Sequence, residues 1–97
     1  MPFYAVRYTY DERADVRDRV RPEHRAYLAA LVDQGLLLGS GPFADSERPG
    51  ALLVFRAADE QAVRAALEAD PFTREGLIAE AEVRPWDLVI GPWAAPA

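Results

Sequence analysis

His24 is the only histidine in the chain, which makes it the first candidate for chemistry. An imidazole changes its protonation near neutral pH and can serve as a general acid or a general base. Leu28 and Leu31 follow at positions i+4 and i+7, so on a helix the three side chains share one apolar face. We therefore expect the imidazole to point toward the core. A lone inward-facing histidine is also compatible with a packing role, and that alternative stays open.

Asp70 is the second candidate, because it follows Ala66 and Leu67 at helical spacing and shares their inward face. A carboxylate beside an imidazole fixes the tautomer of the ring and stabilises its protonated form. If the two residues form a pair, a ring nitrogen of His24 should lie about 2.6–3.2 Å from an Asp70 oxygen. Since Pro71 follows directly, Asp70 can instead act only as a turn residue.

Four further residues are candidates for contacts with a substrate, namely Tyr8, Arg21, Ser40 and Gly41. The Arg21 guanidinium can hold an anionic group, and the Ser40 hydroxyl or the Gly41 N–H can donate to a developing oxyanion. Simpler interpretations exist for two of these sites. Residues 39–41 are typical of a turn at the end of a strand, and Tyr8 is also suited to packing.

The chain supplies six elements that can position these residues. Alternation of apolar side chains predicts strands at 2–10 and 77–86, and short apolar runs predict strands at 36–40 and 51–56. A first helix is expected from Pro22, a favoured first helical residue, to Gly35. A second helix is expected after the cap Asp59. The charged residues 11–20 are interpreted as a connection that can contain a helical turn of its own, and residues 44–50 as a polar turn.

The order strand, helix, strand, strand, helix, strand predicts an α+β fold, the ferredoxin-like βαββαβ motif with a four-stranded antiparallel sheet. With strand order 4-1-3-2, the start of the first helix and the end of the second meet at one edge of the sheet. His24 and Asp70 are therefore expected to converge there, together with Ser40 and the pair Tyr8 and Tyr10.

Composition limits the classes of function. The net charge is −5, and phosphate binding needs clustered basic charge, so nucleic acid is not an expected partner. Five arginines at 13–25 alternate with acidic residues, which is typical of a solvated face. With no cysteine and one histidine, a structural zinc site is excluded, and we expect neither a metal nor a cofactor. No apolar run is long enough to span a bilayer, and we expect a cytoplasmic protein.

The predicted strand at 51–56 is apolar without alternation, which indicates burial on both faces of the sheet. Two helices can cover only one of these faces. We therefore expect a second copy of the chain to cover the other face, so that the protein is a homodimer.

Four short motifs together resemble the YCII-related (YciI-like, DGPF-type) family. They are VRPEHRAYL at 20–28, LLLGSGPF at 36–43, ADPF at 69–72 with Gly76, and VRPW at 83–86. The resemblance spans residues 2 to about 86. The expected organisation is a family domain at 1–87 followed by a C-terminal tail at 88–97.

The resemblance implies a dimeric α+β barrel with a His–Asp centre, which falls on His24 and Asp70. One relative in chloroaromatic degradation removes chloride from a hydroxyquinone. The function we expect is a small cofactor-free lyase or isomerase that moves a proton on a cyclic or aromatic oxygenated small molecule. Two alternatives stay open: a non-catalytic small-molecule-binding or accessory dimer, and a cofactor-free monooxygenase-like barrel.

Overall fold

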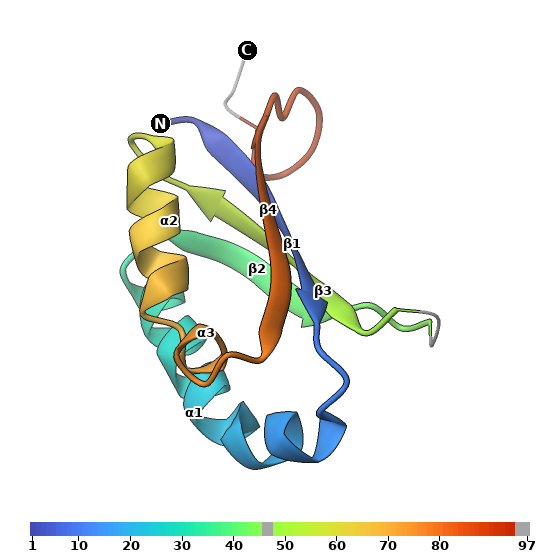
Figure 1. Ribbon diagram of the computed structural model, residues 1–97. Coiled ribbons are helices and arrows are strands. Elements are labelled where there is room, and N and C mark those ends of the chain that lie inside the picture. Colours follow the sequence, from blue (N-terminus) through green and yellow to red (C-terminus); the bar gives the residue numbers. More distant parts are fainter. Residues whose placement is uncertain (46–47, 95–97) are drawn as a thin grey trace.

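Seven elements follow one another along the chain in the computed structural model, which describes residues 1–45 and 48–94 (Figure 1). They are β1 (Phe3–Tyr10), α1 (Ala14–Asp33), β2 (Leu37–Pro42), β3 (Gly50–Arg56), α2 (Glu60–Glu68), α3 (Pro71–Arg74) and β4 (Ile78–Trp86). Residues 46–47 of the expected turn and 95–97 of the tail lie outside the described residues. No helix in the described part is long and apolar enough to cross a bilayer.

The four strands form one antiparallel sheet in the order β2-β3-β1-β4, which confirms the predicted ferredoxin-like α+β fold. β1 and β3 are central and pair over most of their lengths. Side chains of β1 alternate, so Tyr4, Val6 and Tyr8 are buried on one face.

Both long helices cover that same face of the sheet (Figure 1). Leu28 and Leu31 of α1 and Val63 of α2 pack there against the buried side chains of the central strands, such as Leu53 and Phe55. A second apolar cluster of Val20, Phe72 and Leu77 lies with α3 and the end of β1, beneath the candidate site. Burial of this apolar area is the main stabilising term of such a fold.

The first helix begins eight residues before the expected start, so the interpretation of residues 11–20 as a connection is wrong. α1 begins at Ala14, and its first turns bury Arg17 and Val20. Pro22 therefore lies inside the helix, where it has no N–H for the carbonyl of Asp18. Figure 1 shows the first turns of α1 (blue) running at an angle to the rest, which is the usual effect of an internal proline.

The predicted helix ends are confirmed elsewhere. The Asp59 carboxylate caps α2 by accepting from the N–H of Ala62. Gly35 adopts a φ of 78° directly after α1, a conformation that only glycine enters at little cost. The short helix α3 was not expected. It starts at Pro71, so Asp70 caps α3 rather than simply ending α2.

The outer face of the sheet carries no helix (Figure 1). Leu52 is 44% exposed there, whereas Val54 is buried. The chain after β4 returns to this face, and the indole of Trp93 would lie 3.4 Å from a side-chain carbon built on Gly39. These four residues and Trp86 surround an apolar hollow on the outer face.

Candidate active site

α1 carries the imidazole of His24 on its inward face, one turn before Leu28, and both side chains are buried. The helix periodicity that places leucines against the sheet thus also places the imidazole there. Because α1 begins at Ala14, His24 lies in the middle of the helix, not near its start. A mid-helix backbone is held by hydrogen bonds on both sides, so the position of the ring is well defined.

Asp70 lies between α2 and α3 and is completely buried. Its Oδ1 accepts from the N–H of Phe72 at 3.0 Å, which caps α3. The same Oδ1 lies 2.7 Å from Nδ1 of His24. The expected His–Asp contact is therefore present, and the turn role considered as its alternative is filled by the same carboxylate.

Tyr8 completes the surroundings of the carboxylate. Its hydroxyl donates to Oδ2 of Asp70 at 2.9 Å. Burial raises the pKa of Tyr8, and the charge of Asp70 raises it further, so the hydroxyl keeps its proton and remains a donor. Asp70 thus has three partners: the Tyr8 hydroxyl, the Phe72 N–H and the His24 ring. These hydrogen bonds offset the hydration that the buried carboxylate loses.

The plane of the imidazole is held by an aromatic stack. The rings of His24 and Phe72 lie face to face, with centroids 3.8 Å apart and an angle of 3° between their planes. Tyr10 packs edge-on against the ring of Phe72, with the two ring centroids 5.6 Å apart. With Nδ1 engaged by Asp70 and one face covered, the ring keeps Nε2 for other contacts.

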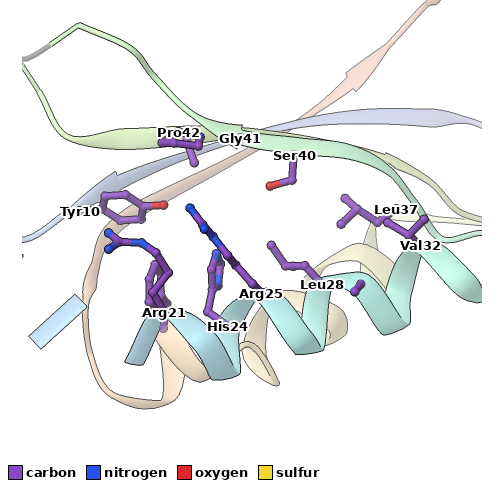
Figure 2. Close-up of a pocket in the computed structure, with 13 residues that line it drawn as sticks. Tyr10, Arg21, His24, Arg25, Leu28, Val32, Leu37, Ser40, Gly41 and Pro42 are labelled. Atoms are coloured by element: carbon purple, nitrogen blue, oxygen red, sulfur yellow. The ribbon is translucent and has the colours of Figure 1, made fainter. Parts of the chain in front are cut away.

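A cavity of about 370 Å³ opens in front of His24, between α1 and β2 (Figure 2). Its wall is formed by Tyr10, Arg21, His24, Arg25, Leu28, Ala29, Val32, Leu37, Ser40, Gly41, Pro42, Ala51 and Phe72. In the described part of the chain, every fully buried side-chain nitrogen and oxygen has a hydrogen-bond partner. Nε2 of His24 has no such partner, so this atom is not fully buried. Nε2 is therefore accessible from the cavity.

Three of the four expected substrate contacts line this cavity, namely Arg21, Ser40 and Gly41. Tyr8 does not: it lies behind the His–Asp pair and contacts Asp70 instead. Tyr10, two residues further along the same strand, lines the cavity in its place. Figure 2 shows the hydroxyls of Tyr10 and Ser40 directed into the space beside Arg25.

Sequence reasoning placed Tyr10 at this edge of the sheet but missed Arg25 and Phe72. A signal for Arg25 was present, because Arg17, Arg21 and Arg25 recur every four residues and so share one side of a helix. That side contacts the site rather than bulk solvent alone: Arg17 is buried with its guanidinium 4.9 Å from the ring centre of Tyr10. No sequence signal distinguished Phe72 from an ordinary core residue.

No group of three or more His, Cys, Asp or Glu side chains within residues 1–45 and 48–94 is arranged to hold a metal ion. The site as described consists of one imidazole, one carboxylate, several hydroxyls and two arginines around an apolar cavity. Such a set is suited to moving protons on a small polar ring and to binding negative charge.

This chain is similar to known proteins both in sequence and in fold. The YCII-related domain matches residues 1–87. Protein YciI of Escherichia coli O6:H1 is 33% identical over 94 residues, covering 87% of this chain and 96% of that protein. Protein YciI of Shigella flexneri matches to the same extent.

Among solved structures, the 5-chloro-2-hydroxyhydroquinone dehydrochlorinase TftG from Burkholderia phenoliruptrix AC1100 superposes with a TM-score of 0.77 at 25% identity. It covers 88% of this chain and 93% of its own, and it holds 2,5-dihydroxybenzoquinone. SnoaB, a cofactor-independent oxygenase from Streptomyces nogalater, shares the fold with a TM-score of 0.54 at 15% identity, over 95% of this chain and 96% of its own. By its sequence match over residues 1–87, this chain belongs to the YCII-related family.

Proposed function

We propose that the chain is a small cofactor-free lyase or isomerase, in which His24 moves a proton on a cyclic or aromatic oxygenated small molecule. One observation supports this above all others: Nδ1 of His24 is held by Asp70 at 2.7 Å, while Nε2 is accessible from a cavity. A histidine that served packing alone would need neither a buried carboxylate nor an accessible second nitrogen.

In this proposal the carboxylate of Asp70 accepts a hydrogen bond from the Nδ1–H of His24, so the neutral imidazole carries its lone pair on Nε2. Nε2 removes a proton from the substrate and becomes imidazolium, which Asp70 stabilises. The electron pair left on the substrate then expels an anion from a neighbouring carbon, as in a lyase, or takes the proton back at another atom, as in an isomerase. Neither outcome needs an oxidant or a reductant.

Negative charge that develops on a substrate oxygen is stabilised by hydrogen-bond donors in the cavity wall. Ser40 and Tyr10 supply hydroxyls on two sides of the cavity, and the Gly41 backbone lies beside Ser40. Burial raises the pKa of Tyr10, and the charge of Asp70 adds to that effect, so this hydroxyl remains protonated and able to donate. Arg21 can contact an anionic group at the cavity entrance.

The similarity to TftG favours an elimination reaction on an oxygenated ring. TftG is a dehydrochlorinase of a chlorinated hydroxyhydroquinone and was solved with a dihydroxybenzoquinone. Elimination of hydrogen chloride from such a ring needs a base for the proton and donors for the oxygens, and the cavity of this chain offers both. We take a single oxygenated ring as the substrate class.

We further propose that the working form is a homodimer whose outer sheet faces pack together as an α+β barrel. The face without helices is the one that carries the exposed Leu52 and the half-exposed tryptophans Trp86 and Trp93. Apolar side chains of this size on an open sheet face are stabilised by burial against a partner.

Chloride release from 5-chloro-2-hydroxyhydroquinone tests the proposed chemistry. We expect turnover by the wild type, a loss of about 10²–10⁴-fold in His24→Ala, and a strong but smaller loss in Asp70→Asn. Arg19→Gln, an exposed change on α1 away from the cavity, serves as the matched control and should retain the rate.

Equal rates for the wild type and His24→Ala would refute the assigned role of the imidazole. Tight binding of the ring without any consumption, by a correctly folded wild type, would instead favour the alternative of a binding or accessory protein.

A further inference from the structure

Two arginines, Arg21 and Arg25, are the only Arg, Lys, Asp or Glu side chains that line the cavity in the described part of the chain. No carboxylate lines it, although the whole chain carries a net charge of −5. Positive charge is thus concentrated at one opening of an otherwise acidic protein. A distribution of this kind attracts anions to the opening.

The two arginines differ in their partners. Arg21 is already engaged by Asp18 on the surface of α1. Arg25 forms no ion pair among the described residues. Figure 2 shows its side chain extending from α1 across the cavity toward Gly41 and Pro42 on β2. Arg25 is an exposed residue that lines the cavity, and its guanidinium, without a carboxylate partner among the described residues, offers several N–H donors to a ligand.

From these contacts we infer that the cavity takes an organic anion, and that Arg25 is the specificity residue that binds its charge. The inference rests on the proposed function only for the identity of the site, since anion binding can be measured without turnover. The resemblance that suggested the His–Asp pair does not extend to a role for this arginine.

Tyr10 supports the inference independently, because its hydroxyl points into the same space. Burial and the charge of Asp70 raise the pKa of Tyr10, whereas the charges of Arg21, Arg17 and Arg25 act in the opposite direction. The guanidinium of Arg17 lies 4.9 Å from the ring centre of Tyr10, and Arg21 and Arg25 line the same cavity as the Tyr10 hydroxyl. A ligand oxygen placed beside that hydroxyl would be subject to the same positive potential.

The other end of the cavity is apolar. Leu28, Val32 and Leu37 form that end, on α1 and β2 beyond His24. On α1, Arg25 lies next to His24 and Leu28 lies one turn further on. A ligand that fits these three parts of the wall has its negative charge at Arg25 and its reacting atoms at His24. Its apolar edge lies against the aliphatic side chains.

A carboxylate and an ionised ring hydroxyl present the same chemistry to Arg25, so the test uses one probe of each kind. Calorimetric titrations with benzoate, with 4-nitrophenolate and with neutral benzamide compare the wild type, Arg25→Gln and Arg19→Gln. Arg19 is a suitable control because it is exposed, lies on the same helix and loses the same charge.

We expect Arg25→Gln to weaken binding of at least one anion by about tenfold, the size expected for one charge-assisted hydrogen bond. Arg19→Gln should stay within about twofold of the wild type. Anion affinity should fall as salt is raised, and benzamide should bind more weakly and respond to neither change. The anion that binds more tightly identifies the carboxylate or the ring hydroxyl as the source of the charge.

Equal anion affinities of Arg25→Gln and Arg19→Gln, or no binding of either anion by the wild type, would overturn the inference. His24→Ala separates it from the proposed function. If this variant and the wild type bind the anion alike but neither turns over any substrate, the inference stands and the proposed function fails. If turnover depends on His24 while Arg25→Gln leaves anion binding intact, the reverse holds.

Discussion

Phe72 contacts both members of the His–Asp pair. Its ring lies 3.8 Å from the imidazole of His24, centroid to centroid, and its backbone N–H donates to Oδ1 of Asp70 at 3.0 Å. The side chain thus sets the plane of the base while the backbone sets the position of the carboxylate. Because both contacts come from the first residues of α3, the geometry of the site depends on that short helix.

Replacing the stacked ring should release the imidazole. In Phe72→Leu we expect the ring-current shift on the His24 carbon-bound protons to be lost, together with about 1–2 kcal/mol of stability. His24 is the only histidine, so its NMR signals are unambiguous. Leu67→Val, a buried change on α2, is the control: it should lower stability by about 1 kcal/mol and leave the imidazole signals unmoved. Unchanged His24 shifts in Phe72→Leu would contradict the stack.

Alkaline pH should reveal the buried tyrosine behind the carboxylate. The pKa of Tyr8 is raised above its ordinary value of about 10 by burial and by Asp70. Above that pH an unfolded tyrosine releases its proton while the folded Tyr8 keeps it, so the free energy of unfolding falls as pH rises. This part of the stability is fully present below pH ~10 and is lost above it.

Urea denaturation at several pH values measures this effect. Tyr8→Phe should reduce the alkaline slope by up to about 1.4 kcal/mol per pH unit. At neutral pH the same change should cost about 1–3 kcal/mol, because Oδ2 of Asp70 loses its donor. Tyr4→Phe is the neutral-pH control and should cost within about 0.5 kcal/mol, because Tyr4 is a buried residue whose hydroxyl forms no side-chain hydrogen bond in the described part of the chain. An alkaline slope identical in the wild type and Tyr8→Phe would rule out this account.

The tail should contribute to stability through Trp93. Its indole lies over Gly39, and the residue is 46% exposed, so about half of its surface is buried. We expect Trp93→Ala to lower the free energy of unfolding by about 1–2 kcal/mol. Ile90→Ala, in the same segment but 88% exposed, should stay within about 0.5 kcal/mol. If both variants unfold like the wild type, residues 88–94 do not dock on the sheet.

A charge on the open sheet face should dissociate the proposed dimer. Light scattering of the wild type should give twice the chain mass, with an interface of about 800 Å² per partner. Leu52→Asp should give a folded monomer, because the aspartate would be buried without a partner in the dimer but is tolerated at a position that is 44% exposed in the single chain. Gln61→Asp adds the same charge on α2, away from that face, and should remain dimeric. A monomeric wild type at micromolar concentration would exclude the barrel arrangement.

Much of this protein is determined locally, and that part was predictable. Period-two alternation in β1 and the apolar run of β3 are properties of a few adjacent residues, as are the Asp59 cap and the stop at Gly35. The inward faces of His24 and Asp70 follow from helical spacing to nearby apolar residues. Strand order and connectivity then bring the two side chains to one edge of the sheet.

The start of α1 was not predictable in the same way. Pro22 favours a helix start when only its own backbone is considered. The helix nevertheless extends back to Ala14, because its first turns bury Arg17 and Val20 against residues that are distant in sequence. Burial of Val20 beside Phe72 and Leu77 is a tertiary gain that outweighs the missing hydrogen bond of one proline.

The roles of Tyr8 and Tyr10 were decided by the tertiary structure. Both lie on the same face of β1 by alternation, so the sequence cannot say which hydroxyl meets Asp70 and which meets the cavity. That choice depends on the position of β1 relative to α1 and α3, and on the irregularity after Thr9 in its pairing with β4. The reach of Arg25 across to β2 and the contact of Trp93 with Gly39 are likewise relations between distant segments. Such relations arise only when the sheet and the helices pack together, because no local pattern of residues encodes the distance between two elements.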